Sequence, residues 1–343
     1  MQKIAIVGFG AMGQMHANCY RLIPRAKVVA IVDAHPDSAR ATQEKLGFDW
    51  PVYPSLDELF AAQEVDAVDI CLPTDLHVPV GLQVVAAGKH LFCEKPFAPT
   101  PEEGKKLVEA ARRKKVFLMV GHCIRFWPEY QYLQKFVEEA KYGKLLSLAM
   151  QRRASRPTYS NQNWLQNLAR SGGAVYDLHI HDTDFALHLL GKPSAVTSVG
   201  TRDYSGWAHV FTTYHYKNVA VTAEGGWNYP EKYGFNMSWQ AIFEDAVLDF
   251  DFTRTPTLRL TAGKKEPKEI EIKKPKKSSA DALTGNISSL GGYLNELKYW
   301  IECLETKTPP QISTGKQAVA SVVAIATEVK SLEAGGKTME LKF

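Results

Sequence analysis

A glycine-rich turn near the N-terminus constrains the fold of this chain more than any other stretch. Residues 3–7 are short, apolar and largely β-branched, a pattern typical of a buried parallel strand. They lead into the turn Gly8–Gly13, with the pattern G-x-G-x-x-G, and then into an amphipathic segment that predicts a helix. A second predicted strand, residues 27–32, ends at Asp33, about twenty positions beyond the last glycine. This order of strand, glycines, helix and acid predicts a dinucleotide-binding βαβ unit.

The residue types in this unit each have a physical reason. Gly8 permits the tight turn, Gly10 lets a pyrophosphate approach the backbone, and Gly13 lets the helix pack on the strand. The helix N-terminus offers N–H donors and the positive end of its dipole. Asp33 can accept both ribose hydroxyls and would repel a 2′-phosphate, and no Arg or Lys immediately follows it, so NAD is favoured over NADP. On the motif alone, a fortuitous glycine-rich turn stays open as an alternative.

The alternation of strands and helices continues to about residue 120. Further strands are predicted over residues 65–72, 90–93 and 116–120, with helices between them. Ligands of open α/β sheets bind at the carboxyl ends of the strands, so the loops that follow these strands are candidate contacts. Residues 1–123 are therefore predicted to form a Rossmann domain. The predicted cofactor contacts are Gly8, Phe9, Gly10, Ala11, Met12, Gly13, Asp33, Pro73, Thr74, His77, Glu94 and Lys95.

Length and composition bound the remaining possibilities. A chain of 343 residues suits two domains, and 45% hydrophobic with 23% charged residues is typical of a soluble globular protein. The net charge of +4 is mild and the basic residues form no stripe with interleaved aromatics, so no nucleic-acid partner is expected. No apolar run has membrane-spanning length, and no signal-peptide pattern precedes the first strand. Five cysteines without C-x-x-C spacing indicate a reducing compartment, hence the cytoplasm.

Residues 124–343 are predicted to form an α+β domain with a large, mostly antiparallel open sheet. Helices are expected over residues 129–142, 177–190, 288–304 and 313–334, and the C-terminal helix could pack back on the first domain. Residues 153–171 are expected to be an irregular loop, and loops of that length in a compact domain are usually functional. The strands are predicted over residues 145–152, 196–200, 209–216, 219–224, 237–243, 246–250, 257–260 and 269–272, with a short last strand within 338–343.

The stretch 172–184 carries two glycines, several acids and two histidines. Within and beyond it, Asp177, His181, Asp184 and His188 recur at i, i+4, i+7 and i+11, so they share one face if the segment is a regular helix. An acid and a histidine one turn apart are what a proton-transfer site needs, because the imidazole titrates near neutrality and the carboxylate can orient it. A solvated polar face would show the same spacing, so both interpretations stay open on this stretch alone.

Taken in order, the segments GFGAMG, PTDLH, CEKP, GHCIRFWP and SGGAVYDLHIHDTD resemble the glucose–fructose oxidoreductase / inositol dehydrogenase (Gfo/Idh/MocA) family. The resemblance covers nearly the whole chain, and its distinctive parts are E-K-P and the later G-G-x-x-x-D-x-x-x-H. It implies that Lys95 lies beside the nicotinamide and the substrate hydroxyl. It also implies that His181 is the general base and that Asp177 holds substrate hydroxyls and tunes that base. Dimers or tetramers formed through the open sheet face are implied as well.

The chemistry of the residues agrees with the resemblance. A secondary alcohol is a very weak acid, so its oxidation needs a base for the O–H proton and a cation for the developing alkoxide, which Lys95 could supply. Trp164 is implied to lie near the substrate, although a Trp that fastens its loop to the core fits the sequence equally well. Arg125 could close over the substrate or pair with an acid at the domain boundary. The predicted substrate contacts are Lys95, His122, Arg125, Trp164, Asp177 and His181.

Two rival functions are also compatible with parts of the sequence. A metal site is disfavoured because His179, His181 and His188 are spaced by two and seven residues, whereas zinc-binding helices favour i and i+4, and no cysteine is near. A non-catalytic NAD-binding regulator could lose Lys95, Asp177 or His181 without penalty, and all three are present. The sequence therefore predicts an NAD-dependent dehydrogenase that takes hydride from a secondary hydroxyl of a sugar or cyclic polyol, inositol-like in kind. A relative acting on a non-sugar substrate stays open.

Overall fold

The computed structural model of the chain describes residues 1–272 and 290–343. By internal contacts these residues form two compact units. The first contains Met1–Cys123, Tyr159–Trp164 and the described residues from 290 to Val319. The second contains Ile124–Thr158, the described residues from Leu165 to 272, and Ala320–Phe343. The predicted division into residues 1–123 and 124–343 stays a prediction, because short later segments group with the first unit.

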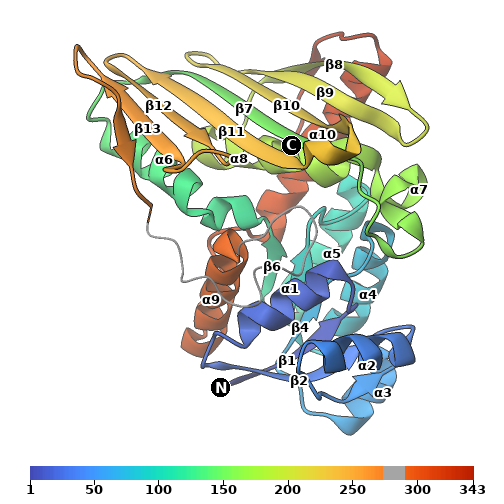
Figure 1. The fold of residues 1–343 in the computed structure, drawn as a ribbon. Helices are drawn as coiled ribbons and strands as arrows, with labels where there is room; N and C mark the ends of the chain where they lie inside the picture. The colour runs from blue at the N-terminus through green and yellow to red at the C-terminus, as the bar shows by residue number, and fades with distance from the viewer. Residues whose placement is uncertain (273–289) are drawn as a thin grey trace. The chain divides into compact units, whose positions relative to one another are not determined.

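The first unit is built on a six-stranded parallel sheet with the order β3-β2-β1-β4-β5-β6 (Figure 1). This is the doubly wound order of a dinucleotide-binding domain, so the predicted Rossmann fold is confirmed. The two-residue strand β3 was not predicted, because two residues are too short to show a period. The strands are β1 (Gln2–Val7), β2 (Ala26–Val32), β3 (Val52–Tyr53), β4 (Ala67–Ile70), β5 (His90–Glu94) and β6 (Leu118–Gly121).

The helices of this unit begin where local signals predict. The hydroxyl of Ser55 accepts the N–H of Glu58 at 3.3 Å, and that of Thr100 accepts the N–H of Glu103 at 3.3 Å. The last helix of the unit, α9, packs against α1. Its predicted start at Ser288 lies outside the described residues. The helices are α1 (Ala11–Tyr20), α2 (Pro36–Lys45), α3 (Leu56–Ala62), α4 (Thr74–Ala86), α5 (Pro101–Lys114) and α9 (Gly291–Thr306).

The second unit is built on a nine-stranded sheet with the order β14-β13-β12-β11-β7-β10-β9-β8-β15. All its neighbouring strands are antiparallel except β7 and β10, which are parallel. The predicted large, mostly antiparallel sheet is therefore confirmed. Its strands are β7 (Leu145–Ser155), β8 (Ala195–Asp203), β9 (Gly206–His215), β10 (Ala220–Tyr229), β11 (Phe235–Phe243), β12 (Ala246–Asp251), β13 (Leu258–Ala262), β14 (Lys268–Ile270) and β15 (Met339–Glu340).

Helices cover one face of this sheet, as Figure 1 shows for α6 and α8. Ile325 of α10 joins Ile180 and Val210 in one buried cluster, which places α10 on the same face. The helical segments are α6 (Pro128–Glu139), α8 (Ile180–Leu190), α10 (Gly315–Glu333), the short helix α7 (Leu168–Ser171), the π-helical turn η3 (Val175–His179) and the 3₁₀ segments η1 (Cys123–Phe126), η2 (Asn161–Gln166) and η4 (Glu231–Tyr233).

Three predicted segments differ from the structure. The helix expected to end at residue 142 ends at Glu139, because Ala140 turns into the left-handed region with φ 47°. The loop expected over residues 153–171 begins with the end of β7 and contains η2 and α7. The helix expected from residue 177 is regular only from Ile180, because the preceding turn is a π-helix.

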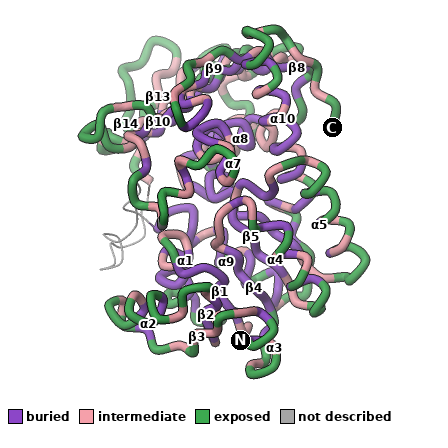
Figure 2. The backbone as a smooth tube through the Cα atoms, turned by 90° about the vertical axis from the view of Figure 1, so that its right-hand side faces the viewer, coloured by how far each residue is buried: buried purple, intermediate pink, exposed green. Residues whose placement is uncertain are grey.

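The sheet alternates between a buried and an exposed face, as the colours along its strands show (Figure 2). Leu148, Met150 and Arg152 of β7 point to the buried face. The opposite face leaves apolar side chains in solvent, among them Val199, Phe211 and Ile242 at 52%, 50% and 37% exposure. Within residues 1–272 and 290–343, one face of this sheet is thus uncovered, as the sequence predicted.

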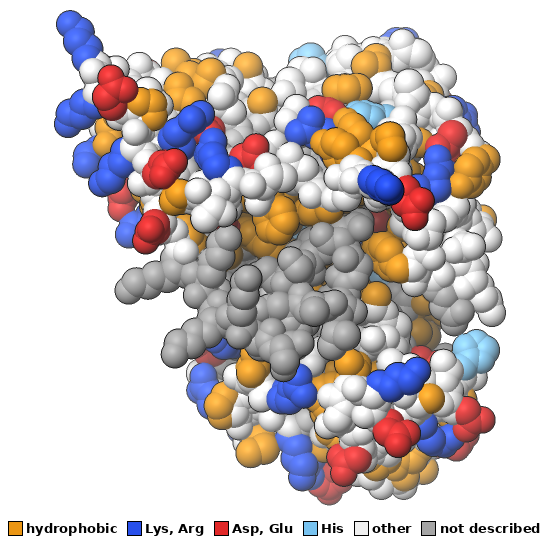
Figure 3. Space-filling model, viewed as in Figure 1, with side chains coloured by type: hydrophobic (Ala, Val, Ile, Leu, Met, Phe, Trp, Pro, Cys, Tyr) orange, Lys and Arg blue, Asp and Glu red, His pale blue; other side chains and the backbone are white. Residues whose placement is uncertain are grey.

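Charged side chains of both signs are mixed over the surface that Figure 3 shows, with apolar patches between them. This agrees with the mild net charge of +4. Among the described residues, no helix combines the length and the apolar character needed to cross a bilayer.

Arg152 provides a test of what holds the second unit together. Its Nε and Nη2 atoms each lie 3.0 Å from the Asp182 carboxylate, and both side chains are buried. We expect Asp182→Ala to lower the free energy of unfolding by about 3–5 kcal/mol, because a buried guanidinium loses its acid partner. Urea denaturation measures the change. The double variant Arg152→Met with Asp182→Leu should recover part of the loss, and a single variant within about 1 kcal/mol of the parent would contradict the argument.

Candidate functional site

The glycine turn has the close contacts that the motif requires. Gly8 has φ +89°, and a Cβ on it would lie 2.8 Å from the carbonyl oxygen of Cys71. A Cβ on Gly13 would lie 2.1 Å from the carbonyl oxygen of Gly8, so the start of α1 could not approach β1 with any larger residue. By contrast, no described heavy atom lies within 4 Å of a Cβ on Gly10. The turn is therefore closed on the side of the sheet and open at Gly10.

The start of α1 fits an anionic group. Gly10 is its N-cap, no described side chain caps it, and its first turn contains no acid. Its first N–H groups can therefore donate to a phosphate, and the helix dipole favours negative charge there. Beside this turn, Asp33 accepts the N–H of Phe9 through Oδ2 at 2.8 Å and that of His35 through Oδ1 at 2.8 Å. The acid is thus held at the end of β2 next to the glycines, as a ribose acceptor would be.

The loop after β4 is fastened to the loop after β5 by His77. Its Nδ1 lies 2.8 Å from the carbonyl oxygen of Pro96, and its Nε2 lies 2.8 Å from that of Leu72. Burial lowers the pKa of His77, although both carbonyls favour its protonated form. The ring is buried and braces two strand ends. Pro73 is the N-cap of α4 and Thr74 begins that helix, so both lie at the same edge of the sheet as the glycine turn. Their roles as cofactor contacts stay predictions.

Lys95 follows β5 directly, at the edge where the parallel strands end. Its backbone N–H donates to Oε2 of Glu94 at 3.0 Å. The Lys95 residue is half-buried, whereas Glu94 is buried and its carboxylate is turned toward the core. His122 follows β6 at the same edge and is buried. Five strand ends thus bring together the candidates of the first unit, as the sequence predicted for a parallel sheet.

In the second unit, Asp177 lies in the π-helical turn η3 and His181 in the first turn of α8. Asp177 is half-buried and His181 is 8% exposed. The π-helical turn changes the register between them, so the even spacing expected of one regular helix does not hold. Such turns are rare and occur frequently at functional sites. Their roles in proton transfer stay predictions.

The other polar residues of this segment are engaged inside the unit. Asp184 accepts two hydrogen bonds from Arg125, at 2.7 and 2.8 Å, and one from Ser321 at 2.6 Å. His179 Nε2 lies 2.9 Å from Oε2 of Glu328 on α10. The Nε2 of His188 lies 3.2 Å from the side-chain oxygen of a glutamine on α6, and Asp182 pairs with the arginine on β7 already described. These contacts anchor α8, which carries His181.

Arg125 and Trp164 each had two possible roles. The structure contains the ion pair of Arg125, with Asp184 as the acid, and both side chains are buried. A substrate contact by Arg125 stays a prediction. Trp164 is half-buried in η2 and belongs to the first unit, and its role near the substrate stays a prediction.

A buried cluster in the first unit was not predicted. His16 of α1 lies 2.8 Å from Asp69 of β4 and 3.1 Å from Glu94. The sequence did contain a signal, because Asp69 interrupts an otherwise apolar strand, and a charged residue in a fully buried strand needs a partner. Nothing in the local pattern names that partner, since His16 and Asp69 are far apart in the chain.

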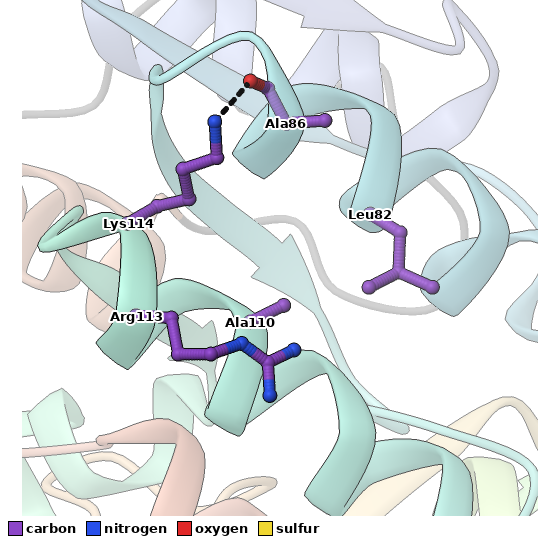
Figure 4. Close-up of a pocket in the computed structure, with 5 residues that line it drawn as sticks. All are labelled: Leu82, Ala86, Ala110, Arg113 and Lys114. Atoms are coloured by element: carbon purple, nitrogen blue, oxygen red, sulfur yellow. Dashed lines mark hydrogen bonds between the residues drawn. The ribbon is translucent and has the colours of Figure 1, made fainter.

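A surface pocket of about 330 Å³ lies between α4 and α5. Lys114 extends across it and donates to the carbonyl oxygen of Ala86 at 3.1 Å (Figure 4). Both residues lie at the C-terminal ends of their helices, which is the edge of the sheet opposite to the glycine turn. This pocket is therefore separate from the candidate residues. It is lined by Leu82, Ala86, Ala110, Arg113 and Lys114.

Comparison with known proteins matches both parts of the chain to one family. Residues 2–122 match the family described as "Oxidoreductase family, NAD-binding Rossmann fold", and residues 130–248 match the "GFO/IDH/MocA C-terminal domain". Inositol 2-dehydrogenase of Rhizobium meliloti is 32% identical over 198 residues, covering 57% of each chain. Myo-inositol 2-dehydrogenase of Thermotoga maritima is 32% identical over 190 residues, covering 55% of each. The matched region thus spans little more than half the length of these curated relatives.

Solved structures share the fold over the full length. Levoglucosan dehydrogenase, in a complex with NADH and levoglucosan, has a TM-score of 0.85 at 20% identity, with 100% of both chains covered. An oxidoreductase from Agrobacterium radiobacter, in a complex with NAD⁺, L-tartaric acid and magnesium, has a TM-score of 0.84 at 18% identity, covering 99% of this chain and 98% of that one. At such identities the likeness shows the fold alone.

Asp33 offers a direct test of cofactor preference. We expect the parent protein to bind NAD more tightly than NADP, because the Asp33 carboxylate would accept ribose hydroxyls and would repel a 2′-phosphate. Asp33→Asn should weaken NAD binding about tenfold, since a charge-assisted hydrogen bond is lost, and it should reduce the ratio of the affinity for NAD to that for NADP. Titration calorimetry with both nucleotides measures this. Asp37→Asn is the matched control, because Asp37 is an exposed acid in the first turn of α2. Tighter binding of NADP by the parent would show that the role given to Asp33 is wrong.

Proposed function

Because the chain belongs to the Gfo/Idh/MocA family of oxidoreductases, we propose that it is an NAD-dependent dehydrogenase acting on a secondary hydroxyl of a sugar or cyclic polyol. The observation that carries this proposal is the glycine turn with Asp33 at one edge of a parallel sheet, with Lys95 at the end of another strand of that edge. The residues Asp177 and His181 of the second unit complete the set required for the chemistry.

The residues of the first unit suit NAD. In this proposal the N-terminus of α1 binds the pyrophosphate over Gly10, and Asp33 holds the ribose. The open space at Gly10 and the absence of an acid in the first turn of α1 support this. When bound, NAD supplies the hydride acceptor, which is chemistry that no side chain of the protein can provide.

The protein's own residues handle the proton and the developing charge. The substrate's O–H proton would go to His181; NAD, when bound, would accept the hydride from the same carbon, so the product would be a ketone or lactone. The ammonium group of Lys95 stabilises the oxygen as negative charge develops on it. Asp177 accepts hydrogen bonds from neighbouring substrate hydroxyls and tunes His181. His122, Arg125 and Trp164 are proposed as further substrate contacts.

A polyhydroxylated ring is the proposed substrate class. Relatives named inositol 2-dehydrogenase and levoglucosan dehydrogenase support it, since both names describe oxidation of such rings. The half-buried carboxylate of Asp177 suits a substrate that presents several hydroxyl donors. The rival function, a regulator that binds NAD without turnover, predicts binding of the cofactor but no reduction of it.

We propose that the protein forms a homodimer or homotetramer through the uncovered face of the nine-stranded sheet. Val199, Phe211 and Ile242 are half-exposed apolar side chains on that face. A large sheet with one uncovered apolar face is typical of a self-complementary interface.

A substrate panel tests the catalytic proposal. Inositols, levoglucosan and common aldoses are offered with NAD, and NADH formation is followed by absorbance. We expect at least one polyol or sugar to be oxidised, and His181→Ala and Lys95→Met each to lower kcat/KM by about 10²–10⁴-fold, because each removes a group acting on the reacting hydroxyl. His188→Gln is the control, since His188 bonds a glutamine of a neighbouring helix and has no role in the proposed reaction. Binding of NAD with no turnover on any substrate would favour the regulator instead.

Sedimentation velocity tests the interface. Phe211→Asp places a charge on the uncovered face and should shift the protein toward the monomer at micromolar concentration, because burying an unpaired carboxylate opposes association. Leu22→Asp is the control, since Leu22 is similarly exposed at 43% but lies in the first unit. If Phe211→Asp leaves the parent's oligomer unchanged, that face is not the interface.

A further inference from the structure

One histidine and three acidic side chains meet in the dry core of the first unit, with the thiol of Cys71 3.3 Å from His16 Nδ1. They come from four elements: His16 from α1, Asp69 from β4, Glu94 from β5 and Glu296 from α9, and none is more than 3% exposed. Three acids and one imidazole without water would be costly unless their charges were balanced. The proposed reaction gives His16, Asp69 and Glu296 no role, so the cluster needs another explanation.

A chain of contacts runs through this cluster to Lys95. His16 Nδ1 lies 2.8 Å from Oδ2 of Asp69, which also accepts the hydroxyl of Tyr20 at 2.9 Å. On its other side, His16 Nε2 lies 3.1 Å from Oε1 of Glu94. The second oxygen of Glu94, Oε2, accepts the backbone N–H of Lys95 at 3.0 Å. The carboxylate of Glu94 is therefore shared between the core and the strand end that carries Lys95.

Gly121 on the neighbouring strand β6 leaves the space that the Glu94 carboxylate occupies. A Cβ on Gly121 would lie 2.7 Å from Oε1 of Glu94 and 3.3 Å from Oε2, so a larger residue would displace the Glu94 side chain. The carboxylate is thus confined by β6 and oriented by His16. Confinement by backbone together with a charged partner leaves the side chain little freedom to rotate.

We propose that His16, Glu94 and Glu296 are positioning residues that fix the strand end carrying Lys95, with Glu296 holding a proton beside Glu94. This inference rests on the proposed function, in which Lys95 acts on the substrate oxygen. It assigns Glu94 a role in holding Lys95 in addition to any contact with the cofactor. Since His16 lies on the helix that begins at the glycine turn, the same cluster ties that helix to the Lys95 segment.

The placement of Glu296 supports a proton on this residue. One of its carboxyl oxygens lies within 4.8 Å of one ring nitrogen of His16 and of one carboxyl oxygen of Glu94. Among the described residues neither oxygen has a hydrogen-bond partner. Burial raises the pKa of Glu296 well above its ordinary value of 4.5, and the charge of Glu94 raises it further. Glu296 is therefore the member of the cluster whose surroundings favour the neutral, protonated form.

The charge on His16 completes the balance. Burial opposes its protonation, but the charges of Asp69 and Cys71 and the hydrogen bonds to both outweigh burial, and the pKa of His16 lies well above its ordinary value of 6.5. The imidazole of His16 thus lies between the carboxyl groups of Asp69 and Glu94, with Glu296 beside them. Each carboxylate oxygen of Glu94 faces a positive or N–H group, which is the arrangement that holds it in one orientation.

Kinetics of paired variants test the positioning role. Glu94→Ala should lower kcat by about tenfold to hundredfold, because a reacting group displaced by about 1 Å loses that much. Glu94→Gln should recover most of the loss, since its amide oxygen can still accept the Lys95 N–H. The control is Glu64→Gln, an exposed acid of the same unit that pairs with a surface lysine. A folded Glu94→Ala with the parent's kcat would overturn the inference.

A spectroscopic readout needs no substrate and so separates this inference from the proposed function. Lysines are labelled by reductive ¹³C-methylation, and the Lys95 signal is assigned by its loss in Lys95→Arg. In Glu94→Ala we expect the Lys95 signal to shift while the other lysine signals keep their positions. An unchanged Lys95 signal would overturn the positioning role, even if the parent oxidises a sugar. A shifted signal supports it, even if no substrate is found.

The proton on Glu296 has its own test. The infrared difference between the parent and Glu296→Gln at pH 7 should show the carbonyl stretch of a protonated carboxyl in the parent only. Because the folded pKa of Glu296 is raised, its contribution to stability is full below the unfolded value near 4.5 and is lost as pH rises toward the folded value. The Tm of Glu296→Gln minus the Tm of the parent should therefore increase as pH rises from about 5 to about 8. Identical infrared spectra of the two proteins, together with a Tm difference that does not change with pH, would overturn the assignment of a proton to Glu296. Stoichiometric zinc that the parent retains and the variant loses would overturn it as well.

Discussion

Charges removed from water must find partners in place, and this requirement organises both units. In the second unit, Asp182 and Asp184 of α8 are each paired with a buried arginine, from β7 and from η1. The helix cannot slide or rotate on the sheet without separating these pairs. In the first unit, His16 and its acids connect α1, β4 and β5 in the same manner. The candidate residues lie on or next to elements held in this way, so their geometry depends on these buried charge pairs.

Much of the first unit could be predicted from the sequence because its signals are local. The glycine turn, the apolar strands and the hydroxyl caps at Ser55 and Thr100 each occupy a few consecutive residues. The shared edge of Asp33 and Lys95 follows from parallel topology alone. The acid that pairs with Arg125 could not be predicted, because the pairing depends on tertiary packing over a long sequence separation. The π-helical turn at Asp177 was missed for a similar reason, since no local pattern distinguishes it from a regular helix.

The histidines of the segment 172–188 illustrate how far residue type can guide a functional prediction. Three histidines within ten residues suggested a metal or a proton relay, but each has a different environment. His179 is paired with a buried acid on α10, and His188 contacts α6. His181, in the first turn of α8, is the one to which the family resemblance assigns chemistry. Spacing identified the segment, and only tertiary contacts distinguish its members.

The position of β7 in the nine-stranded sheet has a consequence for how the second unit folds. This strand lies between two meanders, β8 to β10 and β11 to β14, and pairs in parallel with β10. The meanders can form from neighbouring hairpins, whereas β7 can pair only with strands that lie more than sixty residues later in the chain. Closing such long loops is entropically slow, so assembly around β7 is expected to limit the folding rate. Until it inserts, both meanders expose an edge strand, and a newly made chain is most prone to aggregation during that interval.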